Sequence, residues 1–98
     1  LTESEDLEGA LAWADIVYQT RIQKERFATE KEYLKFKGSF VITRALADSM
    51  KEGAIIMHPL PRVDEIAPEV DTSPHARYFE QARYGLYVRM ALLHELLH

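Results

Sequence analysis

Residues 54–66 read Ala54-Ile55-Ile56-Met57-His58-Pro59-Leu60-Pro61-Arg62-Val63-Asp64-Glu65-Ile66, and this stretch decides the fold. The apolar run at its start predicts a short buried strand. Proline has no amide hydrogen and keeps the preceding residue extended, so the two prolines that flank Leu60 end the strand. A stiff elbow therefore follows the carboxyl end of the strand. Open α/β sheets place their ligand crevices at such ends.

Strand and helix patterns alternate before this elbow. Short apolar runs predict strands at 16–20, 40–42 and 54–57. Three Ser/Thr-type capping patterns predict helices: Thr2 with Glu5 for a helix over about 4–13, Thr29 with Glu32, and Thr43 for a helix to about Met50. Gly38 and Gly53 stand where the second and third helices should end. The predicted fold class is α/β, a portion of an open parallel sheet with flanking helices.

The end of the chain carries the clearest helical pattern. After a helical turn expected near 65–70, six apolar residues recur every three or four positions: Phe79, Ala82, Leu86, Met90, Leu93 and Leu97. This spacing predicts a long C-terminal helix with one apolar stripe. The stripe is long for the sheet that the preceding residues can supply.

Composition excludes several functional classes. The net charge of −4 provides no basic surface for nucleic acid. The sequence has no cysteine, so it offers neither disulfides nor a thiolate metal site. No apolar run approaches the roughly 20 residues of a membrane span, and no secretory leader pattern is present. We expect a soluble, cytoplasmic protein that binds no membrane.

Three blocks of the sequence resemble the aspartate carbamoyltransferase family. Residues 58–66 resemble its C-terminal signature, residues 15–27 its aspartate-binding strand and turn, and residues 78–93 its long terminal helix. Ornithine-type members place a cysteine after the histidine of the elbow, whereas this chain has Pro59. The resemblance implies a Rossmann-like aspartate-binding domain and the transfer of a carbamoyl group from carbamoyl phosphate to L-aspartate in pyrimidine biosynthesis. This reaction requires neither a redox cofactor nor a metal.

The turn after the first strand supplies the expected aspartate contacts. Arg21 offers a rigid fork of donors that matches a carboxylate, and Gln23 adds a neutral donor and acceptor. The resemblance implies that both hold the aspartate carboxylates. Glu25 is expected to support Arg21 by aiming its guanidinium. Judged without the resemblance, the residues favour the interpretation of Arg21 as a surface arginine in a solvated turn.

The elbow supplies the expected carbamoyl phosphate contacts. The carbonyl groups of Pro59 and Leu60 lose their ladder partners where the strand ends, so they can accept hydrogen bonds from the carbamoyl nitrogen. The resemblance implies this role for Pro59, Leu60 and Pro61, together with a cis peptide bond before Pro61. We expect His58 and Arg62 to be supporting residues, and no catalytic residue is assigned. Without the resemblance, the elbow could be a merely stiffened loop.

The resemblance also implies partners. The carbamoyl phosphate half of the family carries a Ser-Thr-Arg-Thr loop and a His-Pro-x-Gln loop, and neither occurs here. We therefore expect residues 1–98 to be the C-terminal part of the aspartate/ornithine-binding domain, inactive alone and completed by an N-terminal half. Family members form catalytic trimers. Residues 28–38 resemble a mobile loop of the family, and a state-dependent contact between Tyr33 and Asp64 is expected.

Two other functions are compatible with parts of the sequence. The run His94-Glu95-Leu96-Leu97-His98 matches the His-Glu-x-x-His pattern of zinc metallopeptidases, with His75 or Glu80 needed as a third ligand. The apolar stripe of the last helix could instead belong to a noncatalytic half-domain that binds a partner protein.

Overall fold

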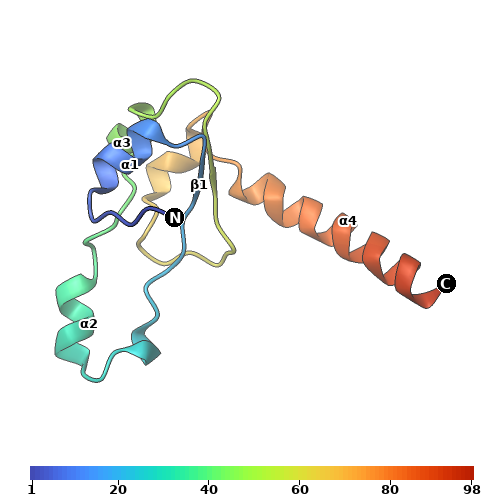
Figure 1. Ribbon diagram of the computed structural model, residues 1–98, viewed down its shortest axis with the longest axis horizontal. Helices are drawn as coiled ribbons and strands as arrows, with labels where there is room; N and C mark the ends of the chain where they lie inside the picture. The colour runs from blue at the N-terminus through green and yellow to red at the C-terminus, as the bar shows by residue number, and fades with distance from the viewer.

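A small parallel sheet lies at the centre of the structure, a computed structural model that describes residues 1–98 (Figure 1). Its strands are β1 (Ile16–Tyr18) and β2 (Ile55–Met57), with Ile16 opposite Ile55. On the other side of β2, the Ile56 N–H donates to the His75 carbonyl and the Arg77 N–H donates to the Ile56 carbonyl. β2 is thus paired along both edges, as predicted for a buried parallel strand.

Helices connect and flank these strands, which confirms the predicted α/β class. They are α1 (Leu7–Trp13), η1 (Lys24–Arg26), α2 (Glu30–Phe36), α3 (Arg44–Asp48), η2 (Pro68–Thr72) and α4 (Tyr78–Leu97), where η marks a 3-10 helix. The Thr29 side chain accepts the Glu32 N–H and begins α2, and the Thr43 side chain accepts the Leu46 N–H and begins α3. Both predicted N-caps are therefore confirmed.

Two of the predicted elements are wrong in extent or type. The first helix begins at Leu7 and not near residue 4, because the Asp6 side chain caps it by accepting the Gly9 N–H at 3.0 Å. The strand predicted at 40–42 is a single bridge between Ile42 and Ile66. Thr43 begins α3 immediately after Ile42, so the chain leaves the sheet direction before a ladder can form.

The core lies between the sheet, α1, α3 and the segment around η2. Nine apolar residues form it: Leu11, Ile42, Ala47, Met50, Ala54, Ile56, Ile66, Val70 and Tyr78. Only 13 of the 98 residues are buried, so this core is small and each of its large side chains contributes a considerable share of the stability.

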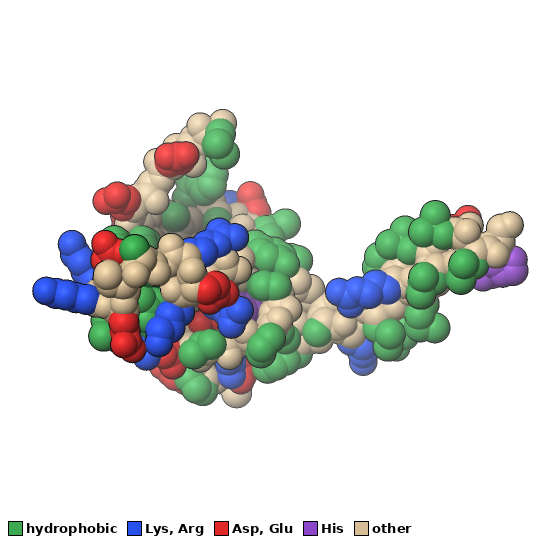
Figure 2. Space-filling model, turned by 90° about the horizontal axis from the view of Figure 1, so that it is seen from below, with side chains coloured by type: hydrophobic (Ala, Val, Ile, Leu, Met, Phe, Trp, Pro, Cys, Tyr) green, Lys and Arg blue, Asp and Glu red, His purple; other side chains and the backbone are tan.

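The helix α4 leaves the body of the molecule after its first turn (Figure 1). Of its 20 residues only Tyr78 is buried, and apolar side chains such as Leu86, Leu93 and Leu97 are more than half exposed. In the space-filling view its hydrophobic side chains stand apart from the body, with histidines at the tip (Figure 2). The predicted helix is present, but its stripe has no partner within residues 1–98. None of the helices is long and apolar enough to cross a membrane.

We expect Ile56→Ala to lower the free energy of unfolding by about 2–5 kcal/mol, because it opens a cavity in the core under β2. Ile16→Ala in β1 is the matched control, since Ile16 is 61% exposed and Ile56 is completely buried. Urea unfolding of the chain, followed by circular dichroism, measures both variants. Equal losses would contradict this description of the core.

A candidate substrate-binding cavity

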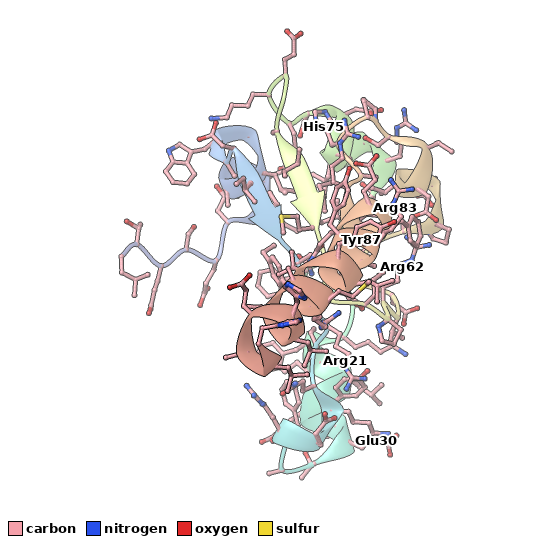
Figure 3. All side chains as sticks on the ribbon, turned by 90° about the vertical axis from the view of Figure 1, so that its right-hand side faces the viewer. Arg21, Glu30, Arg62, His75, Arg83 and Tyr87 are labelled. Carbon is pink, nitrogen blue, oxygen red and sulfur yellow. The ribbon has the colours of Figure 1, made fainter.

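A cavity of about 700 Å³ lies between the segment that follows β1 and the elbow that follows β2. It is lined by Thr20, Arg21, Ile22, Gln23, Arg26, Phe27, His58, Pro59, Leu60 and Pro61. Arg21 lies between α2 and the body of the molecule (Figure 3). Two segments that are far apart in the sequence thus meet at the carboxyl ends of paired parallel strands. The proline-rich sequence of the elbow predicted a ligand crevice at this place.

The first wall of the cavity carries cationic and amide side chains. The Arg21 Nη2 lies 3.6 Å from the Glu25 Oε1, and both side chains are at least half exposed. An exposed pair of this kind is weak, so the guanidinium keeps donors available for a ligand. Arg26 lies in the same wall because η1 turns the chain back, with the Arg26 N–H donating to the Gln23 carbonyl.

Aromatic packing joins this wall to α2. The Phe27 ring lies 5.8 Å from the rings of both Tyr33 and Phe36. No hydrogen bond joins Tyr33 to Asp64 in this structure, in which the Tyr33 ring packs against Phe27. Asp64 instead pairs with the Lys37 Nζ at 3.6 Å.

The second wall is the elbow, and its conformation is unusual. Leu60 has a φ of +49° and the Leu60–Pro61 peptide bond is cis, as expected. A left-handed conformation costs a residue other than glycine about 1–2 kcal/mol, so surrounding contacts must hold Leu60 in place. The His58 Nδ1 supplies one, since it accepts the Leu60 N–H at 2.7 Å.

A buried pair stands behind the elbow. The His58 Nε2 lies 2.6 Å from the Glu65 Oε1, and both side chains are nearly inaccessible. Because Nδ1 accepts a hydrogen bond from Leu60, the ring proton is on Nε2 and donates to Glu65. Burial alone would raise the pKa of the Glu65 carboxyl, but the backbone N–H groups of Glu65 and Val63 and the His58 ring hold it below its ordinary value of 4.5.

The carbonyl oxygens of the elbow are available to a ligand. No hydrogen bond of the structure ends on the carbonyl oxygen of Pro59 or Leu60. Both residues line the cavity opposite Arg21 and Gln23. The cavity therefore offers acceptors on one wall and donors on the other.

Arg62 is turned away from the cavity. Its guanidinium forms a two-pronged ion pair with the Asp71 carboxylate and lies 5.7 Å from the centre of the Tyr78 ring. The hydrogen bond from Arg62 lowers the pKa of Asp71, while burial and then the hydrogen bond to Asp71 raise the pKa of Tyr78 to about 12. This cluster fastens the end of the elbow to η2 and to the first turn of α4.

The structure brings together all the expected cavity residues: Arg21, Gln23, His58, Pro59, Leu60 and Pro61. Sequence reasoning missed Thr20, Ile22, Arg26 and Phe27. The clustering of Lys24 and Arg26 near Arg21 in the sequence was a signal for Arg26. No group of three or more His, Cys, Asp or Glu side chains is arranged to hold a metal ion. The ring centres of His94 and His98 lie 4.2 Å apart, near the end of α4 that is remote from His75 and Glu80.

A family model described as the aspartate/ornithine carbamoyltransferase Asp/Orn-binding domain matches residues 1–96. The aspartate carbamoyltransferase catalytic subunit of Alkaliphilus oremlandii is 54% identical over 99% of this chain, and that of Cenarchaeum symbiosum is 59% identical over 93%. The chain spans 29% of the length of each of these relatives.

Solved structures of aspartate transcarbamoylases are also similar to this chain. Aspartate transcarbamoylase from Trypanosoma cruzi in complex with carbamoyl phosphate superimposes with a TM-score of 0.77 and 43% identity, covering 88% of this chain and 27% of that one. The catalytic subunit from M. jannaschii superimposes with a TM-score of 0.70 and 55% identity, covering 85% and 26%.

We expect the free energy of unfolding to fall as the solution is acidified below about pH 4.5. The folded pKa values of Glu65 and Asp71 lie below their ordinary values of 4.5 and 3.8, so their stabilisation is complete above that range and is lost as the pH falls through the folded values. Tyr78 acts in the opposite direction, because its stabilisation is lost as the pH rises from 10 towards its folded pKa of about 12.

Urea unfolding across these two pH ranges measures both effects. Asp71→Asn should flatten the acidic slope, and Tyr78→Phe should flatten the alkaline slope. Unaltered slopes in both variants would show that the Arg62 cluster does not contribute.

Proposed function

The chain belongs to the aspartate/ornithine carbamoyltransferase family, and we propose that it forms the C-terminal part of the Asp/Orn-binding domain of an aspartate carbamoyltransferase. In this proposal the complete enzyme transfers the carbamoyl group of carbamoyl phosphate to L-aspartate, giving N-carbamoyl-L-aspartate and phosphate for pyrimidine biosynthesis. The observation that carries it is the cavity in which Arg21 and Gln23 face the free carbonyl groups of Pro59 and Leu60.

The chemistry divides between the two walls of the cavity. Arg21 binds an aspartate carboxylate with parallel N–H donors, and Gln23 donates a further hydrogen bond. On the other wall, the carbonyls of Pro59 and Leu60 accept the N–H groups of the carbamoyl amide. Aspartate and carbamoyl phosphate are thereby held side by side, which converts a reaction between two molecules into one within a complex.

The bond changes then require little from these residues. The amine of aspartate attacks the carbamoyl carbon, the bond from that carbon to the phosphate oxygen breaks, and phosphate leaves with the electron pair. The amine loses one proton, which the departing phosphate accepts. The phosphate and the developing oxyanion need cationic groups and N–H donors, which we assign to the carbamoyl phosphate domain. By family resemblance we further propose a homotrimer that acts in the cytoplasm.

The two alternative functions have less support. A zinc peptidase needs a third ligand beside His94 and His98, and no such group is present. The exposed stripe of α4 fits two functions equally well. It could bind a partner protein, or it could pack on the rest of a carbamoyltransferase. The cavity favours the enzyme.

A chimeric enzyme tests the proposal. Residues 1–98 replace the matching 97-residue segment of the Alkaliphilus oremlandii catalytic subunit. We expect the chimera to form N-carbamoyl-L-aspartate, and the 98-residue chain alone to form none, because loss of even one oxyanion donor costs about 10²–10³-fold. A correctly assembled chimera without turnover would contradict the proposed function. Turnover by the chain alone would contradict the division between domains.

We expect Arg21→Ala in the chimera to raise the KM for aspartate by roughly 10- to 100-fold, because the substitution removes one charge-assisted hydrogen-bonded contact. The KM for carbamoyl phosphate should change little. Arg44→Ala is the control, because Arg44 pairs with Asp48 and Thr72 and does not line the cavity. Steady-state kinetics with each substrate varied distinguishes them, and an unchanged aspartate KM would remove Arg21 from the site.

A further inference from the structure

The elbow is anchored by the buried pair of His58 and Glu65, whose side chains are 1% and 7% exposed. The His58 Nδ1 holds the Leu60 N–H at 2.7 Å, and the Glu65 Oε2 holds the Val63 N–H at 3.1 Å. One buried unit therefore fixes an amide on each side of Pro61. The function proposed above gives no role to this pair.

The Leu60 N–H belongs to the same planar peptide unit as the Pro59 carbonyl group, so the orientation of one determines the orientation of the other. A peptide unit is rigid and planar, and in the trans form its carbonyl and its N–H point in opposite directions. The peptide bond between Pro59 and Leu60 is trans, since the only cis bond precedes Pro61. A ring nitrogen that fixes the Leu60 N–H on the buried side thus turns the Pro59 carbonyl oxygen away from the ring. That oxygen has no partner within the chain.

His58 itself has no free group for proton transfer. Both ring nitrogens are engaged, one with Leu60 and the other with Glu65. Its backbone N–H is also held, by the Gln81 Oε1 at 2.9 Å, so that α4 supplies a third anchor. The ring is therefore built to hold the elbow and not to act as a base.

We propose that His58, oriented by Glu65, is a positioning residue that aims the Pro59 carbonyl oxygen at the amide nitrogen of a carbamoyl ligand. This inference rests on the function proposed above. It assigns the selectivity for a carbamoyl group over other acyl groups to a side chain that never touches the ligand. Acetyl phosphate has the same charge and nearly the same shape, but a methyl group in place of the amide.

Two substitutions separate the two hydrogen bonds of the ring. In His58→Gln the side-chain nitrogen reaches the position of Nε2 and keeps Glu65, but nothing accepts the Leu60 N–H. In His58→Asn the side-chain oxygen takes the position of Nδ1 and keeps the Leu60 bond. Adding Glu65→Gln to the asparagine variant avoids an unpaired buried charge and retains an acceptor for the Val63 N–H.

The measurement is the ratio of the dissociation constants for acetyl phosphate and carbamoyl phosphate, by calorimetry on the chimera. We expect the unsubstituted chimera to prefer carbamoyl phosphate. His58→Gln should reduce this preference about tenfold, as expected for one misdirected buried hydrogen bond, and leave the affinity for acetyl phosphate nearly unchanged. His58→Asn with Glu65→Gln should recover most of the preference.

A purely structural role would weaken both ligands equally, and that result overturns the inference, as does an unaltered preference in His58→Gln. If His58→Gln does not fold, Gln81→Leu takes its place, with Gln81→Glu as the control that keeps an acceptor. An unaltered preference in Gln81→Leu would then overturn the inference. An unsubstituted chimera that binds neither phosphate, or has no turnover, instead counts against the proposed function.

Discussion

The structure depends on how the chain meets its backbone hydrogen-bonding requirements where β2 ends. Pro59 and Pro61 have no N–H to offer, so the ladder cannot continue, and the remaining amides need partners inside the protein. The buried pair of His58 and Glu65 supplies partners for the Leu60 and Val63 amides, and Gln81 supplies one for the His58 amide. The pair accepts hydrogen bonds from N–H groups of the elbow and donates none to it. The carbonyl oxygens of Pro59 and Leu60 therefore remain unpaired at the edge of a cavity. The same arrangement that completes the fold therefore creates the acceptors of the site.

The opposite wall is held in a different way. Arg21 and Glu25 are exposed, their ion pair is long, and the wall is attached to the body through the packing of Phe27 on α2. An exposed and lightly packed wall can adapt to a ligand at low cost, whereas the elbow cannot. In this cavity a rigid set of acceptors faces an adaptable set of donors.

Features that depend on a few consecutive residues could be predicted from the sequence. Thr29 and Thr43 cap their helices through bonds three residues away, and the elbow follows from the covalent structure of proline. Features that depend on distant partners could not. Asp6 displaced Thr2 as a cap, and the run at 40–42 paired only through Ile42 with Ile66.

The same distinction applies to the site. Arg21, Gln23 and the elbow could be assigned to the candidate site because the family resemblance of residues 15–27 and 58–66 lies in short runs of consecutive residues. The pairing of Arg62 with Asp71, and of Asp64 with Lys37, joins segments whose approach only the tertiary fold determines. Local sequence named the groups that face the cavity, while the contacts that hold them in place came from packing.

The attachment of α4 has a mechanical consequence. The helix is about 30 Å long and is joined to the body only near its first turn, where Tyr78 is buried and Gln81 meets the elbow. It is therefore a lever with its pivot beside the cavity. A rotation of about 10° at the pivot displaces the far end by about 5 Å while Gln81, one turn away from the pivot, moves by less than about 1 Å. A displacement imposed at the distal end of α4 therefore reaches Gln81, and through it the backbone N–H of His58, with a strongly reduced amplitude.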